Sequence, residues 1–187
     1  MELTKDQTQK IERFAESKLD SLNWQHTLEV REVALKLARL EKADRQIVEA
    51  AALLHDIGKN RGDEGHVPRS EQLARKFLEK EGYEQRFVEE VVYCVSVHTL
   101  PWENQAELLT TPEAKVLFDA DMIQQLSKFG LIKYSLIFSE ELQGDFKEGL
   151  IKVRDTLFKC YNLILTKSGQ QLAEPGYKFV KDFFKEL

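Results

Sequence analysis

A chain of 187 residues, with 42% hydrophobic and 32% charged residues, is long enough to bury the core of one domain and polar enough to be well solvated. Its net charge of −5 and its lack of a basic block argue against binding a nucleic-acid polymer, which depends on clustered Lys and Arg. Cys94 and Cys160 lie far apart and form no CxxC pair, which excludes a thiolate zinc ribbon and argues against a disulfide scaffold. No apolar run approaches the ~20 residues of a membrane span, and the polar start does not resemble a signal peptide, so we expect a cytoplasmic protein without a membrane partner.

The hydrophobic residues repeat with a helical period along the chain, and no segment convincingly alternates as a strand does. Thr4 and Gln7 form a capping-box pattern ahead of the first predicted helix. Asn23 is the predicted cap of the second helix, and Asp44 that of the third. The sequence therefore predicts an all-α, single-domain helical bundle over residues 1–187, with any metal site in its core.

The third predicted helix ends in an unusual polar pair. The run Ala50–Leu54 is typical of a buried helix, and His55 and Asp56 follow it directly before Gly58, a natural helix stop. A carboxylate near a helix C-terminus is disfavoured by the helix dipole, and burying it unpaired costs several kcal/mol. Asp56 therefore needs a positive partner, such as a metal ion shared with His55, unless it simply faces water.

The remaining histidines are placed by the same periodicity. His26 lies one turn before the apolar stripe of the second helix, and His98 extends the stripe of the fifth helix four residues beyond Cys94. His66 is predicted near the end of a polar loop, just before Pro68 opens the fourth helix. Taken alone, each has an ordinary explanation as a buried or a surface histidine.

The next long predicted helix starts at Thr111–Glu113, where a capping hydroxyl, a proline and an acid follow one another. Asp121 lies one turn after Leu117 on its apolar arc, whereas Asp119 is rotated away and is predicted to point outward or toward a neighbouring helix. Polar residues at inward or helix-end positions on separate helices tend to converge in the core of a bundle, where metal sites are built. Five residues share this property: His26, His55, His98, Asp56 and Asp121.

These residues and their flanking sequences resemble the HD-domain superfamily of metal-dependent phosphohydrolases, whose signature is H…HD…D. The matches are His26 in WQHTLEV, His55 and Asp56 in LHDIGK, and Asp121 in FDAD, within roughly residues 20 to 128. The chain is similar to a branch of small, stand-alone nucleotide hydrolases, and residues 129–187 are expected to add C-terminal helices that complete the pocket.

The resemblance implies a divalent transition metal, with manganese as the first choice and iron, cobalt, nickel, zinc or magnesium as alternatives. In the two-metal branches the aspartate of the doublet bridges the ions, and His66 and His98 would hold the second ion or contact a phosphate. One departure is Glu29, which stands where many relatives carry an arginine; whether Arg31 replaces it is left open. The implied ligands of the first ion are His26, His55, Asp56 and Asp121.

This ligand set suits the hydrolysis of a small phosphate ester or anhydride, above all a nucleotide, because a bound ion lowers the pKa of a coordinated water toward ~7. Asp56 is the expected ligand and proton acceptor, and His98 the donor to the leaving group. Lys59 and Arg69 are candidate phosphate contacts, with Lys59 also assigned to catalysis, although solvated surface cations explain them equally well.

Two other functions stay open. Some relatives with a five-part H…HD…H…H…D array are di-iron oxygenases. A non-catalytic regulator could also bind a nucleotide or a protein partner and keep the metal for stability. The sequence determines neither the substrate, nor the number of ions, nor whether the chain forms a homo-oligomer.

Overall fold

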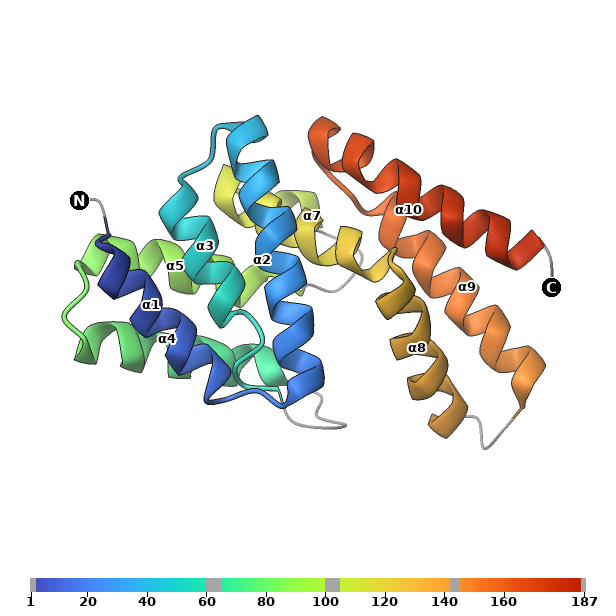
Figure 1. Cartoon of the computed structure of the whole chain (residues 1–187). Helices are drawn as coiled ribbons and strands as arrows, with labels where there is room; N and C mark the ends of the chain where they lie inside the picture. Colours follow the sequence, from blue (N-terminus) through green and yellow to red (C-terminus); the bar gives the residue numbers. More distant parts are fainter. Residues whose placement is uncertain (1–2, 60–64, 100–104, 142–144, 186–187) are drawn as a thin grey trace. The chain divides into compact units, whose positions relative to one another are not determined.

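The computed structural model describes residues 3–59, 65–99, 105–141 and 145–185, and within these ranges it contains helices and no strand. The all-α prediction is confirmed. Two compact units divide the chain, Met1–Phe118 and Asp119–Leu187 (Figure 1). That the two units work as one domain stays a prediction.

The described residues of the first unit form six whole helices and the first half of a seventh. In chain order these are α1 (Lys5–Glu16), α2 (Ser21–Glu41), α3 (Arg45–Leu54), α4 (His66–Lys80), α5 (Gln85–Val97), α6 (Gln105–Leu108) and the beginning of α7 (Pro112–Gln125).

Three of the predicted caps are present. Thr4 and Gln7 form the reciprocal capping box of α1. Asp44 accepts a hydrogen bond of 2.8 Å from the backbone N–H of Gln46 at the start of α3. The Thr111 hydroxyl likewise accepts from the first turn of α7.

Two predicted helix starts were wrong by a few residues. The second helix begins at Ser21 and not at Asn23, because the preceding Asp20 is an equally good cap and accepts a hydrogen bond of 2.8 Å from the N–H of Asn23. The fourth helix begins at His66, two residues before Pro68, after a left-handed Gly65 with φ of 91°.

Helix α3 is the centre of the first unit. It packs against α1, α2 and α5, while α5 also packs against α4. From Ile47 to Leu54 every side chain of α3 except that of Glu49 is buried, as expected for a helix covered on all sides. The C-terminal end of α3 therefore delivers His55 and Asp56 into the interior of the unit.

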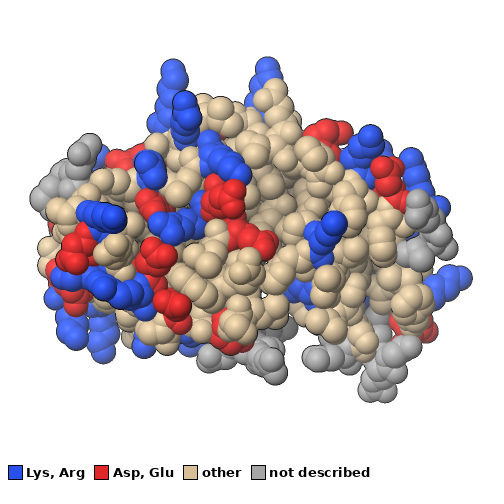
Figure 2. Space-filling model, viewed as in Figure 1, with Lys and Arg blue, Asp and Glu red and all other residues tan. Residues whose placement is uncertain are grey.

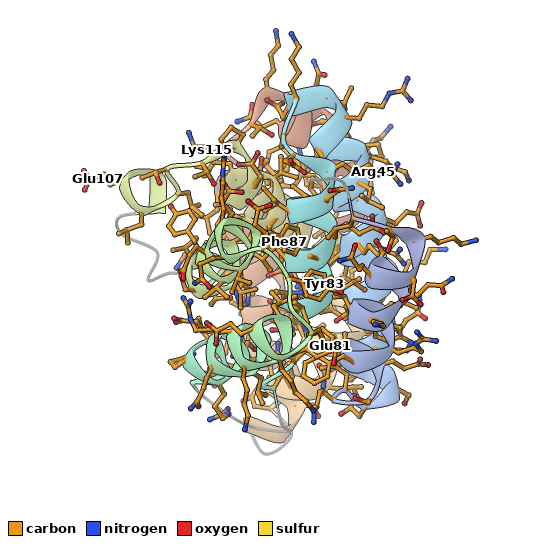
Figure 3. All side chains as sticks on the ribbon, turned by 90° about the vertical axis from the view of Figure 1, so that its left-hand side faces the viewer. Arg45, Glu81, Tyr83, Phe87, Glu107 and Lys115 are labelled. Atoms are coloured by element: carbon orange, nitrogen blue, oxygen red, sulfur yellow. The ribbon has the colours of Figure 1, made fainter. Side chains whose placement is uncertain are left out.

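Two polar contacts brace α3 and its neighbours. The guanidinium of Arg31 on α2 bonds the carboxylate of Glu49 on α3 and lies 3.5 Å from that of Glu12 on α1. Arg31 thus forms a brace between three helices. At the turn between α4 and α5, the Tyr83 hydroxyl donates to the carbonyl of Gln7 at 2.7 Å, and the Tyr83 ring stacks on Phe87 (Figure 3).

In the second unit, the part of the chain that the structure describes forms the end of α7 and three further helices, of which α9 packs against both α8 and α10. Asp119 is fully buried and accepts hydrogen bonds from the N–H groups of Leu165 and Thr166, both at 2.8 Å, and from the Thr166 hydroxyl. It therefore points to the turn between α9 and α10 and not outward. The three helices are α8 (Lys128–Glu141), α9 (Phe146–Asn162) and α10 (Lys167–Lys185).

Charged side chains of both signs are interspersed on the visible face of the first unit (Figure 2). Among the described helices, none is both long enough and apolar enough to cross a bilayer.

Candidate metal centre

Asp56 lies among all four histidines of the chain, inside the first unit. Its Oδ2 oxygen is 3.5 Å from Nε2 of His26 and 3.5 Å from Nε2 of His55. Its Oδ1 oxygen is 3.1 Å from Nε2 of His66 and 3.5 Å from Nε2 of His98. The two carboxylate oxygens therefore face two different pairs of imidazoles, which come from helix ends or inward positions on α2, α3, α4 and α5.

Backbone carbonyls orient two of these rings. Nδ1 of His55 lies 2.8 Å from the carbonyl oxygen of Ala52, and Nδ1 of His98 lies 2.7 Å from that of Val95. A carbonyl only accepts, so Nδ1 carries a hydrogen in both rings, and the neutral form of each ring has its lone pair on Nε2. This is the tautomer and orientation of a histidine that binds a metal through Nε2.

The first pair of imidazoles has the spacing of a ligand set. Nε2 of His26 and Nε2 of His55 are 3.3 Å apart, and each is 3.5 Å from Oδ2 of Asp56. Metal–ligand bonds of about 2.0–2.2 Å at angles between octahedral and tetrahedral separate the donor atoms by about 3.0–3.5 Å. The three residues are therefore one group that could hold a divalent ion.

The second pair forms another such group with the same aspartate. The Nε2 atoms of His66 and His98 are buried and have no hydrogen-bond partner among the described residues, although both lie close to Oδ1 of Asp56. A buried polar atom without a partner costs about 1–3 kcal/mol. An ion bound between these two nitrogens and the carboxylate would remove that cost, so the donor set fits a second metal.

The surroundings of Asp56 keep it ionised. Burial acts to raise the pKa of this carboxyl, but the charge of His55, the contacts with His66 and His98, and the charge of Lys59 together outweigh burial and hold its pKa well below the usual value. A carboxylate that stays charged in the interior is the form that binds a cation.

Comparison with known proteins places the chain in a family. The family model described as HD domain matches residues 23–126, a range that includes every residue of the two groups and Asp121. This chain belongs to the HD domain family. The resemblance inferred from the sequence is confirmed.

Proteins similar to this HD domain are known in two Bacillus species. The uncharacterized protein YpgQ of Bacillus subtilis is 24% identical over 172 residues, which cover 88% of this chain and 82% of YpgQ. The crystal structure of YpgQ in complex with ADP superimposes with a TM-score of 0.75 at 20% identity, covering 96% of this chain and 95% of the other. An HD-superfamily hydrolase from Bacillus thuringiensis has a TM-score of 0.73 at 21% identity, covering 97% and 94%.

Of the other predicted site residues of this HD domain, one lies in the histidine cluster, one beside it and one in the second unit. Nζ of Lys59 lies 3.0 Å from Oδ2 of Asp56, so Lys59 belongs to the cluster. Arg69 uses its Nε to donate to the carbonyl of Gly58 at 3.0 Å, which places it beside the turn after the doublet. Asp121 lies in the second unit, buried, where its Oδ1 accepts from Gln125 at 3.0 Å; its role as a ligand stays a prediction.

Sequence reasoning missed the contact between the doublet and α4. The Gly58 N–H donates to the hydroxyl of Ser70, a fully buried residue, at 2.9 Å. The only signal for Ser70 in the sequence is its spacing of one turn from His66, which is common for a serine without any special role.

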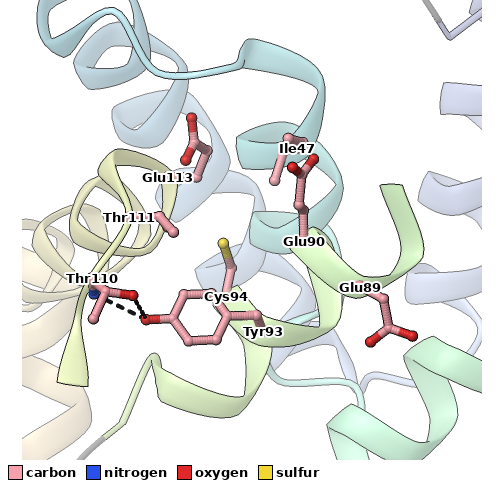
Figure 4. A pocket seen from close by; sticks show the side chains of 8 residues that line it. All are labelled: Ile47, Glu89, Glu90, Tyr93, Cys94, Thr110, Thr111 and Glu113. Atoms are coloured by element: carbon pink, nitrogen blue, oxygen red, sulfur yellow. Dashed lines mark hydrogen bonds between the residues drawn. The ribbon is translucent and has the colours of Figure 1, made fainter. Parts of the chain in front are cut away.

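A separate hollow of about 300 Å³ lies between α3, α5 and the start of α7 (Figure 4). Its carboxylates already have partners, since Glu113 accepts from the N–H of Asp44 at 2.8 Å and Glu89 pairs with Arg75 at 2.7 Å. None of its lining residues belongs to the histidine cluster: Ile47, Glu89, Glu90, Tyr93, Cys94, Thr110, Thr111 and Glu113. The hollow therefore offers no alternative metal site.

Proposed function

We propose that this HD domain is a metal-dependent phosphohydrolase acting on a small phosphate ester or anhydride, and that its substrate is a nucleotide. The observation that carries the proposal is the carboxylate of Asp56, whose two oxygens face two separate pairs of imidazole nitrogens. The ADP found with YpgQ, and the hydrolase named in Bacillus thuringiensis, support the choice of reaction and substrate class.

The residues divide into two ligand groups that share Asp56. His26 and His55 would hold the first ion through Asp56 Oδ2, with Asp121 as the proposed fourth ligand. His66 and His98 would hold a second ion through Oδ1. Mixed imidazole and carboxylate ligands suit manganese, iron, cobalt, nickel or zinc, and we propose manganese first.

When bound, such an ion supplies Lewis acidity, which lowers the pKa of a coordinated water toward ~7 and polarises the phosphorus centre. Asp56 belongs to both ligand groups and is our proposed acceptor for a proton of that water. Lys59, whose side chain is 27% exposed, can neutralise a phosphate that approaches the cluster. His98 has only Nε2 available, because Nδ1 is held by a carbonyl. Nε2 therefore either ligates an ion as part of a neutral imidazole or, in the imidazolium form that carries a proton there, donates that proton to the leaving group.

The test is phosphate release from a panel of nucleotides with defined divalent metals. Asp56→Ala should reduce the rate by about 10³-fold, equivalent to ~4 kcal/mol of lost transition-state stabilisation, because it removes a ligand from both groups. Asp155→Ala is the matched control, since Asp155 is an exposed aspartate of α9 paired only with Arg154 among the described contacts. Hydrolysis that survives both Asp56→Ala and Asp121→Ala would end the proposal.

The same experiment separates the other functions that this ligand array could serve. A di-iron oxygenase would consume oxygen with iron bound and release no phosphate. A regulator would bind a nucleotide without hydrolysing it, whichever divalent metal is added.

A further inference from the structure

The turn after the histidine–aspartate doublet touches the first turn of α4 without any intervening side chain. A Cβ atom added to Gly58 would lie 2.5 Å from the backbone nitrogen of Ser70 and 2.7 Å from the carbonyl oxygen of His66. Both of these are backbone atoms, which cannot rotate away as the end of a flexible side chain can. Glycine is therefore required here by the close approach of two chain segments.

Two hydrogen bonds join Gly58 to α4 at this contact. The Gly58 N–H donates to the Ser70 hydroxyl at 2.9 Å, and Nε of Arg69 donates to the Gly58 carbonyl at 3.0 Å. Helix α4 has no side-chain cap at its start, where the preceding Gly65 is in the left-handed region. These contacts with Gly58 join the start of α4 to the turn after the doublet.

The contact between Gly58 and Ser70 connects two segments that each carry a member of the second ligand group. Asp56 is two residues before Gly58, and His66 is one turn before Ser70 on the same face of α4. The distance between Asp56 Oδ1 and His66 Nε2, 3.1 Å, therefore depends on how closely the turn and the helix approach.

The first ligand group does not depend on α4. His55 and Asp56 are adjacent at the end of α3, and His26 lies on α2, which packs directly against α3. A change at the contact between Gly58 and Ser70 should therefore move His66 relative to Asp56. It should leave His26, His55 and Asp56 in place.

We propose that Gly58 and Ser70 form a clamp that positions His66 against Asp56 and so determines whether this HD domain binds a second divalent ion. This inference rests on the proposed function, because it requires the cluster to hold ions. Ser70 is a positioning residue in it, since its hydroxyl touches Gly58 and neither the ions nor the substrate.

The experiment counts bound ions and measures their affinities by Mn²⁺ titration and by metal analysis of the full chain. Ser70→Ala removes the acceptor of the Gly58 N–H. Gly58→Ala adds a Cβ atom that pushes the turn after the doublet away from α4. For both variants we expect the second ion to bind roughly 10- to 100-fold more weakly, as for other residues that orient ligands, with the affinity for the first ion unchanged.

Tyr83→Phe is the matched control, because it removes a hydrogen bond between elements of the same unit that involves none of the histidines. Helix content is measured first for each variant. If Ser70→Ala or Gly58→Ala does not fold, Ser70→Cys replaces it, because a thiol keeps the volume and is only a weak acceptor.

Two tightly bound ions in the wild type and in every clamp variant would overturn the clamp alone. Equal weakening of both ions, or the same weakening in Tyr83→Phe, would show a purely structural role and overturn it as well. A wild type that binds a single ion would refute the two-ion arrangement and the clamp together. Two bound ions in the wild type, with only the second weakened in the clamp variants and no phosphate release, would refute the proposed reaction and leave the clamp supported.

Discussion

Replacing Asp119 with alanine should strongly destabilise the second unit, although Asp119 belongs to neither histidine group. Its carboxylate is fully buried and accepts hydrogen bonds from the N–H of Leu165, the N–H of Thr166 and the Thr166 hydroxyl. The Thr166 hydroxyl oxygen in turn accepts from the N–H of Gly169 at 2.9 Å, at the start of α10. One side chain of α7 thus holds the turn that joins α9 to α10.

The size of the effect follows from these contacts. A hydrogen bond to a charged group contributes about 1.5–3 kcal/mol, and alanine would remove the acceptor for Leu165 and Thr166 altogether. The donors on Leu165 and Thr166 are only half-buried, so water can replace part of what is lost. We therefore expect a loss of about 3–5 kcal/mol for Asp119→Ala, a large part of the 5–15 kcal/mol that typically stabilises a protein. Asp119→Asn keeps one acceptor oxygen and should lose about half as much.

The assay is urea unfolding followed by circular dichroism, with Asp145→Ala as the matched control. Asp145 is an exposed aspartate of the same unit that accepts a single backbone hydrogen bond, from Glu148 at 3.0 Å, so its loss should cost about 1 kcal/mol. Equal losses for Asp119→Ala and Asp145→Ala would refute the reasoning, because they would mean that the buried contacts of Asp119 contribute no more than an exposed helix cap.

Two further predictions concern the proposed ligand Asp121 and the brace at Tyr83. Gln125→Ala removes the donor to Asp121 Oδ1 and should weaken metal binding about 10- to 100-fold in a metal titration; unchanged affinity would argue that Asp121 is not a ligand. Burial, with the charges of Glu81 and Asp6, raises the pKa of Tyr83 from 10 to about 12. The stability that its neutral hydroxyl contributes is therefore fully present below pH 10 and lost as the pH rises through about 12, so urea unfolding across that range should show a steeper decline for wild type than for Tyr83→Phe.

The features that the sequence predicted well are those that depend on nearby residues. The capping box at Thr4 and the cap at Asp44 involve partners within three residues, so the pattern itself contains the interaction. The buried helix ending at His55 and Asp56 was also recognisable, because an apolar run that stops at a charged pair is a local signal. Helix starts were less certain where two good caps compete, as at Asp20 and Asn23.

The gathering of histidines around Asp56 was predictable for a different reason. Each of His26, His98 and Asp56 is unexpected on an apolar face or at a helix end, and a shared site explains several such placements together. His66 carried no such signal, because it was read as part of a loop, and only the fold shows that it opens α4 and faces Asp56 Oδ1.

The positioning contacts were beyond sequence reasoning, because each joins residues that are distant along the chain and ordinary in type. Asp119 looks like a surface residue until the turn 46 positions later is seen to donate to it. The sequence leaves open whether Arg31 replaces the arginine of other family members, and it does not reveal that its guanidinium pairs with Glu49 and Glu12. Polar groups of this kind are satisfied by partners that only the tertiary fold supplies, and a sequence pattern records the polar residue without its partner. The same argument gives Ser70 its importance: the ligands of a metal site can be read from residue type and spacing, whereas the contacts that set their distances cannot.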